Sequence, residues 1–524
     1  MDANYLALGS LATVIVVLLT SRLRRYWDGM AKLSAIPTYG HDGFFSSYIT
    51  AFEFVKRGTK LVQEGYKKYP NQAFKVAAMN RWTVVVTGKD MVEDLRKAGD
   101  DQLSMSGALN KSLQSDLLFG RGIQTNSYHA EVVGGALTRH LASMFGEVYD
   151  ELSQAFAEEI PLSDGEHIIE VHCHWEPETD TVTSVALEWV KVPTLGKILR
   201  IVCRTSNRLF IGLPLCRDED WKDLNIRHTI EIFTAAGKAS IFPGYWLQRL
   251  VARYLTPLPR NMKRTMELIG PIIEERLEKF RAGEGDSLAD DLLTWLIRAA
   301  PTEEQLKPEQ LGLRMLTLNV AAIHTTSQAF THALINLCKH SEYTEPLRKE
   351  IEDAIEKEGW TKAAMGRMRM LDSFLKESQR VSSSGAISVN RLTLKEFVFS
   401  NGTVLPAGTV IGTSPSALHF DESTYSNPFE FDGLRSYHER EKEGESIKHQ
   451  MVTPGSNYVA FGVGKHACPG RFFAVNEIKA LFSHAILNYD VKLDEKDEPT
   501  KMMETAGRIE SDSKTQVMFR KRRT

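Results

Sequence analysis

Two long apolar segments stand out in the pattern of hydrophobic and polar positions along the chain. Residues 5–20 carry no charged side chain and are followed by three arginines within 22–25. Residues 311–338 are apolar nearly all round, and Arg314 is their only Lys, Arg, Asp or Glu. A helix of this kind is buried on every side. The second segment therefore predicts a helix in the centre of a large core.

Shorter segments of a different composition predict strands. Residues 392–399 and 403–411 are rich in β-branched and aromatic residues and are punctuated by Gly402 and Pro406, as is typical of short strands. The chain has 524 residues, of which 42% are hydrophobic and 25% charged, which is enough for a large core. Neither an internal repeat nor a linker-like Pro/Gly/Ser tract follows residue 45. We therefore expect one large domain over 46–524.

The N-terminal apolar segment predicts a membrane anchor over residues 1–28, followed by a Pro/Gly hinge over 29–45. The alternative is a cleaved signal peptide, but Asp2 rather than a basic segment precedes the apolar run, and the arginines follow it. Basic flanks stay in the cytosol. The run is slightly short, which suits the thin membrane of the endoplasmic reticulum. We expect a single-pass protein in contact with that lipid, with a cytoplasmic catalytic domain.

Net charge and cysteine content narrow the class of protein. The formal net charge is -3 and no basic stripe with interleaved aromatic residues is present, so nucleic-acid binding is not expected. The five cysteines form an odd set without C-x-x-C spacing: Cys173, Cys203, Cys216, Cys338 and Cys468. This pattern favours a reducing compartment.

One of these cysteines lies in a glycine-bracketed loop, Phe461-Gly-Val-Gly-Lys-His-Ala-Cys468-Pro-Gly470. A thiolate ligand of haem iron needs a tight loop that brings backbone N-H groups close to the sulfur, and glycine permits such a loop. A helix that begins near Pro469 would direct its positive N-terminal dipole at the sulfur. The alternative is a buried structural cysteine in a turn. Because several residues of this loop suit an iron ligand, we favour a role of Cys468 as the ligand over a structural role.

The string F-x-x-G-x-H-x-C-x-G resembles the haem-binding signature of the cytochrome P-450 family. The resemblance implies that Cys468 ligates the iron of haem b and that Phe461 and Gly470 belong to the cofactor-binding loop. Two positions before the cysteine the family usually carries an arginine that contacts a haem propionate, whereas this chain has His466. Histidine also donates hydrogen bonds to carboxylates, so His466 is a candidate for the same contact.

The central apolar segment resembles the oxygen-activation helix of the same family. Ala321 and Thr325 lie one turn apart and share a face. The resemblance implies that Thr325 is the threonine that steers protons to dioxygen and that Ala321 leaves room for the macrocycle. His324 replaces the acid that precedes this threonine in the family. His324 could relay protons or be a neutral core histidine, and Thr325 could simply bond to the carbonyl four residues earlier.

Charged residues in the C-terminal third resemble three further family positions. Glu377 and Arg380 lie three apart on one face of a predicted helix and match the E-x-x-R helix, and Arg435 matches the arginine that completes its buried triad. Arg391 lies where family members place a residue that binds a propionate, and Arg139 is a weaker candidate for that role. The alternatives are a surface ion pair for the triad and solvated charges for Arg391 and Arg139.

The resemblance implies a mainly α fold, the triangular helical prism with small sheets of the family, and a haem monooxygenase of lipophilic substrates. No flavin-binding segment is evident, so electrons must come from another protein. We expect NADPH-cytochrome P-450 reductase, with a cytochrome b-type donor as a second source. Residues 206–221 and the His324 variant resemble fungal members that oxidise terpenoids in secondary metabolism. A polycyclic terpenoid is therefore the leading substrate expectation.

Two other functions remain open at this stage. The first is a reductase-independent haem-thiolate isomerase or dehydratase, and the second is a membrane protein that binds haem without catalysis. The pair Ala321 and Thr325 argues against both, because neither function needs a helix that delivers protons to dioxygen.

An apolar stretch over 239–246 could line a substrate channel that dips into lipid, or pack in the core.

Overall fold

The fold was obtained as a computed structural model, which describes residues 20, 23–24, 27, 29–160, 162, 189–383, 385–494, 502–505, 507–511 and 515–522. Most of the predicted anchor, 1–28, and Cys173 lie outside the described residues. Within these ranges, none of the helices combines the length and the hydropathy that a bilayer crossing requires.

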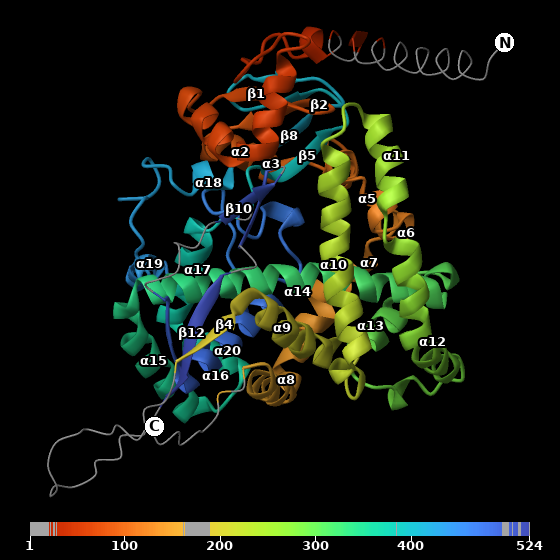
Figure 1. Cartoon of the computed structure of the whole chain (residues 1–524), viewed down its shortest axis with the longest axis vertical. Coiled ribbons are helices and arrows are strands. Elements are labelled where there is room, and N and C mark those ends of the chain that lie inside the picture. The colour runs from red at the N-terminus through yellow and green to blue at the C-terminus, as the bar shows by residue number, and fades with distance from the viewer. Residues whose placement is uncertain are drawn as a thin grey trace, which may run out of the picture.

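Helices make up most of the described chain, as expected (Figure 1). Their bounds in the first half are α2 Ser47–Lys68, α3 Lys89–Lys97, α4 Met105–Leu113, α5 Ser115–Leu118, α6 Arg121–Thr125, α7 Tyr128–Val132, the π-helical turn η1 Val133–Leu137, α8 Thr138–Glu159, α9 Thr194–Phe210, α10 Glu219–Ser240 and α11 Tyr245–Leu255. In the second half they are α12 Leu258–Arg281, α13 Leu292–Ala299, α14 Pro308–Lys339, α15 Thr344–Glu358, α16 Lys362–Arg367, α17 Arg369–Val381, α18 Pro415–Leu418, α19 Arg435–Glu441 and α20 Arg471–Asn488.

The central helix is α14, which crosses the middle of the molecule (Figure 1). It packs against α9, α10, α12, α17 and α20, and its apolar side chains join the largest hydrophobic core. The prediction of burial on every side is wrong at one turn, because Ala321 and Thr325 are exposed. All other residues of 311–338 are buried or half-buried. A helix inside a core that exposes two residues one turn apart borders an open space there.

A five-stranded sheet lies at one end of the molecule, with α8, α9, α16 and α20 near the other end (Figure 1). Its order is β1 Ala73–Ala78, β2 Arg81–Val86, β8 Val410–Thr413, β5 Ser388–Thr393 and β3 Leu103–Ser104. Strands β2 and β8 are parallel, and the other neighbours are antiparallel. The remaining strands are β4 Val190–Pro193, β6 Phe397–Val398, β7 Val404–Leu405, β9 Tyr489–Lys492, β10 Met502–Thr505, β11 Arg508–Ser511 and β12 Gln516–Lys521.

The two strands predicted over 392–399 and 403–411 are four shorter ones. A bend separates β5 from β6, and a turn separates β7 from β8. In that turn Gly408 has φ +88°, in the left-handed region that favours glycine. Both predicted segments contain strand residues, but the composition did not indicate where the chain leaves the strands and turns.

The predicted hinge, 29–45, is fastened to the edge of this sheet. The backbone N-H of Tyr39 donates to the carbonyl of Lys75 in β1 at 2.9 Å, and the N-H of Lys75 donates to the carbonyl of Pro37 at 2.8 Å. The side chain of Lys75 is buried, and its Nζ donates to the carbonyls of Leu33 at 2.7 Å and Ile36 at 2.6 Å. These hydrogen bonds hold the segment to the catalytic body.

Candidate functional site

The cysteine loop is closed by its own backbone. The N-H of Cys468 donates to the carbonyl of Phe461 at 2.8 Å, and the N-H of Ala467 donates to that of Gly464 at 3.0 Å. Gly464 has φ +62°, and a Cβ there would lie 2.6 Å from the carbonyl oxygen of Arg96. Only glycine fits such an approach, so this residue lets the loop turn back on itself.

Cys468 is half-buried and lies just before α20. Burial raises the pKa of the thiol, while the backbone N-H groups of Gly470 and Arg471 and the charge of Arg471 act in the opposite direction. The helix begins at Arg471, two residues later than expected from Pro469. Burial is the largest of these effects, so the pKa of the Cys468 thiol is raised overall and the N-H groups and Arg471 offset burial only in part.

The cysteine loop packs against the segment between α7 and α8. A Cβ on Gly470 would lie 3.3 Å from Val133, and one on Gly134 would lie 3.7 Å from Pro469. Helix α20 also packs against α14. Two segments far apart in sequence, the cysteine loop with α20 and the helix α14, thus belong to one packed unit.

The exposed turn of α14 carries the two residues expected to border the cofactor. The hydroxyl of Thr325 donates to the carbonyl of Ala321 at 2.7 Å. This is the backbone bond that a threonine inside a helix commonly makes. Thr325 nevertheless faces open space, so the bond and a role at the site are compatible. His324 is half-buried, and its ring lies 5.7 Å from that of Phe233 in α10, measured between centroids.

Arg391 is a buried cation in β5, with 3% of its surface exposed. Its guanidinium donates to the carbonyl of Asn390 at 2.9 Å, and no carboxylate of the described residues lies within ion-pair distance. Burial lowers the pKa of Arg391 to about 10, and the charge of Asp100 acts the other way. A guanidinium held out of water without an anion fits a haem propionate, which would supply one.

His466 contacts a carboxylate within the protein. Its Nε2 lies 2.5 Å from Asp100, and Lys465 Nζ lies 2.9 Å from the same side chain. Burial would raise the pKa of Asp100, but the hydrogen bonds from Lys465 and His466 outweigh it and the pKa falls. Asp100 thus ties the cysteine loop to the segment that follows α3. No sequence pattern pointed to this residue, which lies 366 positions from His466.

Arg139 lies in the first turn of α8 and is exposed, whereas the other propionate candidate, Arg391, is buried. No acid of the described part of the chain forms an ion pair with Arg139. Its role toward a propionate stays a prediction.

The structure brings the three residues of the expected triad together. Glu377 accepts from Arg380 at 2.7 and 2.8 Å and from Arg435 Nε at 3.3 Å. The backbone N-H of Asp432 adds a further bond, at 3.0 Å. Glu377 and Arg380 are both buried, and Arg380 also donates to the carbonyl of His419 at 2.6 Å. The cluster is fully paired and joins α17 to the segment before α19, as a structural cluster does.

A second buried charge cluster lies between α17 and α20. Asp372 accepts from Lys479 Nζ at 2.8 Å, from Arg440 at 3.3 Å and from the backbone N-H of Met451 at 2.9 Å. Lys479 also donates to the carbonyl of Met365 at 3.0 Å. The sequence analysis missed this cluster, although a lysine within the apolar run of α20 was a signal. It fixes the helix that begins at the cysteine loop.

Two segments that bear on the substrate lie in different surroundings. Residues 206–212 are buried or half-buried at the end of α9, where Asn207 accepts from Trp221 Nε1 at 2.9 Å, whereas 217–220 are exposed. In 239–246, Phe242 and Trp246 have 40% and 71% of their surface exposed. The stretch 239–246 is therefore a surface feature rather than core packing.

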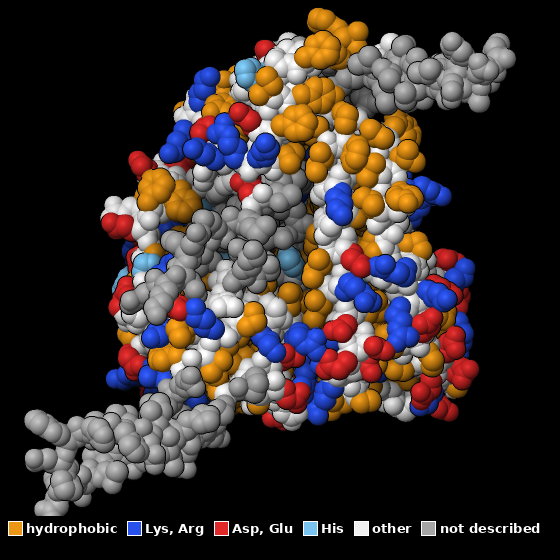
Figure 2. Space-filling view, viewed as in Figure 1, with side chains coloured by type: hydrophobic (Ala, Val, Ile, Leu, Met, Phe, Trp, Pro, Cys, Tyr) orange, Lys and Arg blue, Asp and Glu red, His pale blue; other side chains and the backbone are white. Residues whose placement is uncertain are grey.

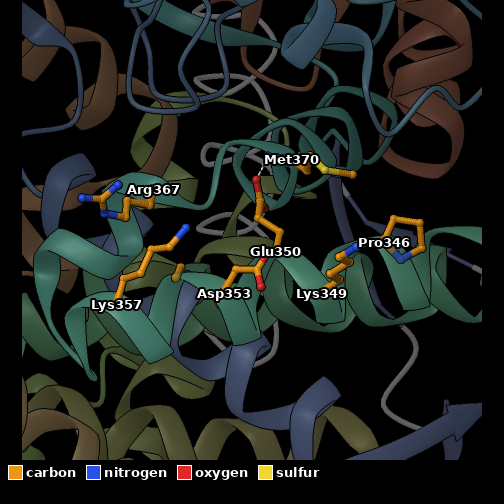
Figure 3. Close-up of a pocket in the computed structure, with 8 residues that line it drawn as sticks. Pro346, Lys349, Glu350, Asp353, Lys357, Arg367 and Met370 are labelled. Atoms are coloured by element: carbon orange, nitrogen blue, oxygen red, sulfur yellow. Dashed lines mark hydrogen bonds between the residues drawn. The ribbon is translucent and has the colours of Figure 1, made fainter.

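An open pocket of about 470 Å³ lies between α15 and the start of α17 (Figure 3). Its Glu350 accepts from the backbone N-H groups of Met370 at 2.7 Å and Leu371 at 2.9 Å, and so caps α17. None of the site residues discussed above lines it. The pocket is separate from the chemistry described here.

Comparisons with known proteins agree on one family. A family model described as Cytochrome P450 matches residues 191–519. The chain is 39% identical to cytochrome P450 monooxygenase 103 of Postia placenta over 91% of each chain. It is 31% identical to cytochrome P450 monooxygenase CYP512U6 of Ganoderma lucidum, over 92% of this chain and 90% of the relative.

The fold agrees with this family as well. The crystal structure of the cytochrome P450DA heme domain superposes with a TM-score of 0.66 at 18% identity, covering 93% of this chain and 98% of that one. The family and the fold imply haem b, and the buried Arg391, the cysteine loop and the open turn of α14 fit it. The isomerase and the non-catalytic alternatives are thereby set aside, and the chain belongs to the cytochrome P450 family as a haem-thiolate monooxygenase.

Proposed function

We propose that this protein binds haem b through the thiolate of Cys468 and hydroxylates a lipophilic substrate, a terpenoid of fungal secondary metabolism. The observation that carries the ligand assignment is the loop geometry: the N-H of Cys468 donates to the carbonyl of Phe461 at 2.8 Å, and this bond closes the loop on the half-buried Cys468 just before α20. When bound, haem supplies the activation of dioxygen and its transfer to carbon.

The remaining cofactor contacts would come from Arg391 and His466. Arg391 is a buried donor without a carboxylate among the described residues, and a propionate would neutralise it. His466 is held by Asp100, so its ring is already oriented. Phe461 closes the loop by accepting from the backbone of Cys468.

Thr325 would hold a proton at its Oγ1 on the substrate side of α14. Its hydroxyl donates to the carbonyl of Ala321, and release of that bond lets Oγ1 pass a proton into the open space. The small side chain of Ala321 leaves this turn accessible. His324 stands in the place of the family acid, and its role in proton delivery belongs to this proposal.

A membrane location at the endoplasmic reticulum, with electrons from NADPH-cytochrome P-450 reductase, completes the proposal. Hydrophobic side chains gather on the surface over α10 and α11 (Figure 2). In α11, Trp246, Leu250 and Tyr254 have 71%, 64% and 88% of their surface exposed. Such a patch suits contact with lipid, from which a lipophilic substrate would enter. The terpenoid assignment is supported by the likeness of 206–221 to terpenoid-oxidising members and by the fungal relatives.

The test begins with the reduced, carbon monoxide-bound spectrum of the purified protein. Cys468→Ala should abolish the thiolate-type band, because no sulfur remains to ligate the iron. Cys338→Ala removes a half-buried cysteine in α14 and serves as the matched control, with an unchanged band expected. A band that survives in Cys468→Ala would refute the ligand assignment.

Turnover of a panel of terpene scaffolds with NADPH and reductase, followed by mass analysis, tests the substrate class.

A further inference from the structure

Arg314 is the only Lys, Arg, Asp or Glu of the apolar segment 311–338, and the site described above does not use it. Its side chain is fully buried in α14. The guanidinium carbon lies 4.5 Å from the ring centroid of Tyr128 in α7, over the face of the ring. Because arginine keeps its charge in proteins, the structure holds a permanent positive charge between these two helices.

The hydrogen-bond acceptors that hold Arg314 are all neutral. Nη2 donates to the carbonyl of Asn126 at 2.9 Å and to the side-chain amide oxygen of Gln305. Nη1 donates to the carbonyl of Gln310 at 3.2 Å and to its Oε1 at 3.3 Å. No carboxylate of the described residues pairs with this cation. A buried charge without a counter-charge is costly, and a carboxylate from outside the chain would remove that cost.

Three polar atoms of this cluster have no hydrogen-bond partner in the part of the chain that the structure describes. They are Nε of Arg314, the hydroxyl of Tyr128 and Nδ1 of His129, and all three are buried. Burial, together with the charge of Arg314, lowers the pKa of His129 to about 4, so its ring is neutral. The guanidinium and the hydroxyl donate, and a neutral imidazole donates from Nδ1 in one of its tautomers. Donors without acceptors suit a group that only accepts, such as a carboxylate.

Arg314 lies on the face of α14 that carries the open turn. It precedes Ala321 by seven residues and Thr325 by eleven. At about 3.6 residues per turn both separations are close to whole turns, so the three side chains share one face. At a rise of about 1.5 Å per residue, Arg314 lies about 10 Å from Ala321 and about 16 Å from Thr325 along the helix axis. A ligand held by Arg314 can therefore extend along α14 to the open turn.

The face of α14 between Arg314 and the open turn carries no second charge. Thr317 is half-buried, and its hydroxyl already donates to the carbonyl of Leu313 at 2.8 Å. Leu318 is buried and apolar, and Ala321 is exposed. The face thus offers hydrogen-bond donors and a positive charge at one end and apolar side chains toward the other. A polycyclic skeleton with an acid group at one end matches both features.

We propose that Arg314 and Tyr128 bind a carboxylate of the substrate, which makes the enzyme selective for lipophilic acids. The carboxylate would accept from Nε of Arg314 and from the hydroxyl of Tyr128, with His129 as a third donor. The apolar body would lie along α14, so the carbon that is oxidised is remote from the acid group. The inference rests on the proposed oxidation of a lipophilic substrate at the open turn, and it narrows the substrate class to acids such as terpenoid carboxylic acids.

Paired ligands test this inference, because a methyl ester keeps the skeleton of an acid and removes its charge. The probes are abietic, oleanolic and dodecanoic acids, each with its methyl ester. Their dissociation constants are measured by equilibrium dialysis with the full-length, haem-loaded enzyme. We expect the wild type to bind at least one acid about tenfold or more tightly than its ester, as hydrogen bonds to a charged group imply.

Substitutions at the cluster should change this preference. Arg314→Gln should weaken acid binding about tenfold or more and leave ester binding unchanged. Arg314→Lys keeps the charge and should retain part of the preference. Tyr128→Phe removes only a hydroxyl and should lower the preference about threefold. Because this last change is small, it also provides the test if Arg314→Gln does not fold.

Arg81→Gln is the matched control. Arg81 also donates only to neutral acceptors and also has an unpartnered Nε within the described residues, but it lies in β2 rather than on α14. Its loss should leave the ratio of acid to ester binding unchanged. An equal loss of preference in Arg81→Gln and Arg314→Gln would mean that the effect is not specific to the cluster, and would overturn the inference.

The other source of a carboxylate is a haem propionate, and the same variants distinguish it. If Arg314 held a propionate, Arg314→Gln would lose haem while the ratio of acid to ester binding stayed unchanged, and the inference would be wrong. Equal binding of acid and ester in every pair by the wild type would overturn it as well. Selective binding of acids without turnover of any of them would support the acid site and refute the proposed hydroxylation instead.

Discussion

The hydroxyl of Thr325 could serve helix structure or proton delivery, and a substitution can distinguish these two roles. Its bond to the carbonyl of Ala321 is an ordinary feature of helices, but Thr325 and Ala321 also face open space, unlike the rest of 311–338. Thr317 makes the same bond, to Leu313 at 2.8 Å, two turns earlier. The two threonines therefore form a matched pair that differs in location.

Thr325→Ala should retain haem and release more peroxide per substrate oxidised, because the hydroxyl that holds the proton is lost. We expect coupling to fall about tenfold. Thr317→Ala loses the same backbone bond away from the open turn and should leave coupling unchanged. Equal uncoupling in both variants would indicate that helix geometry, rather than proton delivery, is affected. Peroxide and product are measured against NADPH consumed.

Single residues also show what the sequence could predict. The cysteine loop and the pair Glu377 and Arg380 were recognisable because their members lie close together in the chain. Asp100 was not, because nothing at position 100 indicates that the loop near His466 will fold against it. Contacts made across the fold leave no local pattern in the sequence.

At the scale of elements, the two buried charge clusters hold α17 and α20 in place. Helix α20 presents almost no polar face, and yet it carries Lys479, which donates to Asp372. A helix with this composition can bury a charge only where a neighbouring element supplies its partner. The apolar composition of α20 predicts its burial, but not the partner.

Lys479→Met should destabilise the protein by about 3–5 kcal/mol, because it leaves the carboxylate of Asp372 buried with only Arg440 as a cationic partner. The midpoint of urea unfolding in the haem-loaded enzyme measures this change. Lys442→Met removes an exposed ion pair with Glu439 and is the control, with a loss of about 1 kcal/mol or less. A similar midpoint in both variants would contradict the role assigned to the cluster.

The strands show how far amino-acid composition can predict structure at the scale of elements. The segments 392–399 and 403–411 do contain strands, but the bend at 394–396 and the turn at 406–409 divide them into parts of β5, β6, β7 and β8. Strand β8 then pairs in parallel with β2, which lies in the first fifth of the chain. Sheet order of this kind depends on the whole fold rather than on local propensity.

At the scale of the whole molecule, hydrophobic side chains gather on the surface over α10 and α11 (Figure 2). Trp246 of α11 has 71% of its surface exposed, whereas Trp295 of α13 has 4%. In vesicles that contain brominated lipid, the fluorescence of the full-length protein should be quenched. Trp246→Phe should reduce that quenching, and Trp295→Phe should leave it. Equal quenching in all three proteins would argue against lipid contact at α11.

The family was predictable from sequence at this scale, because the cysteine loop, the central helix and the E-x-x-R helix occur in one chain in the expected order. The substrate was not. The apolar part of 206–221, on which the terpenoid expectation partly depends, packs in the core at the end of α9. The similarity of this segment to other members of the family therefore indicates common ancestry more directly than it indicates the shape of the substrate pocket.

The hydrogen bonds between residues 33–39 and β1 have a consequence for the proposed contact with a bilayer. Lys75 and Tyr39 fix the chain to β1 before the first long helix begins. If the enzyme is anchored through its N-terminus as proposed, these hydrogen bonds would transmit the tilt of the anchor to the catalytic domain, which could then not rotate freely. The angle at which electron donors approach would then be set by this short stretch of backbone.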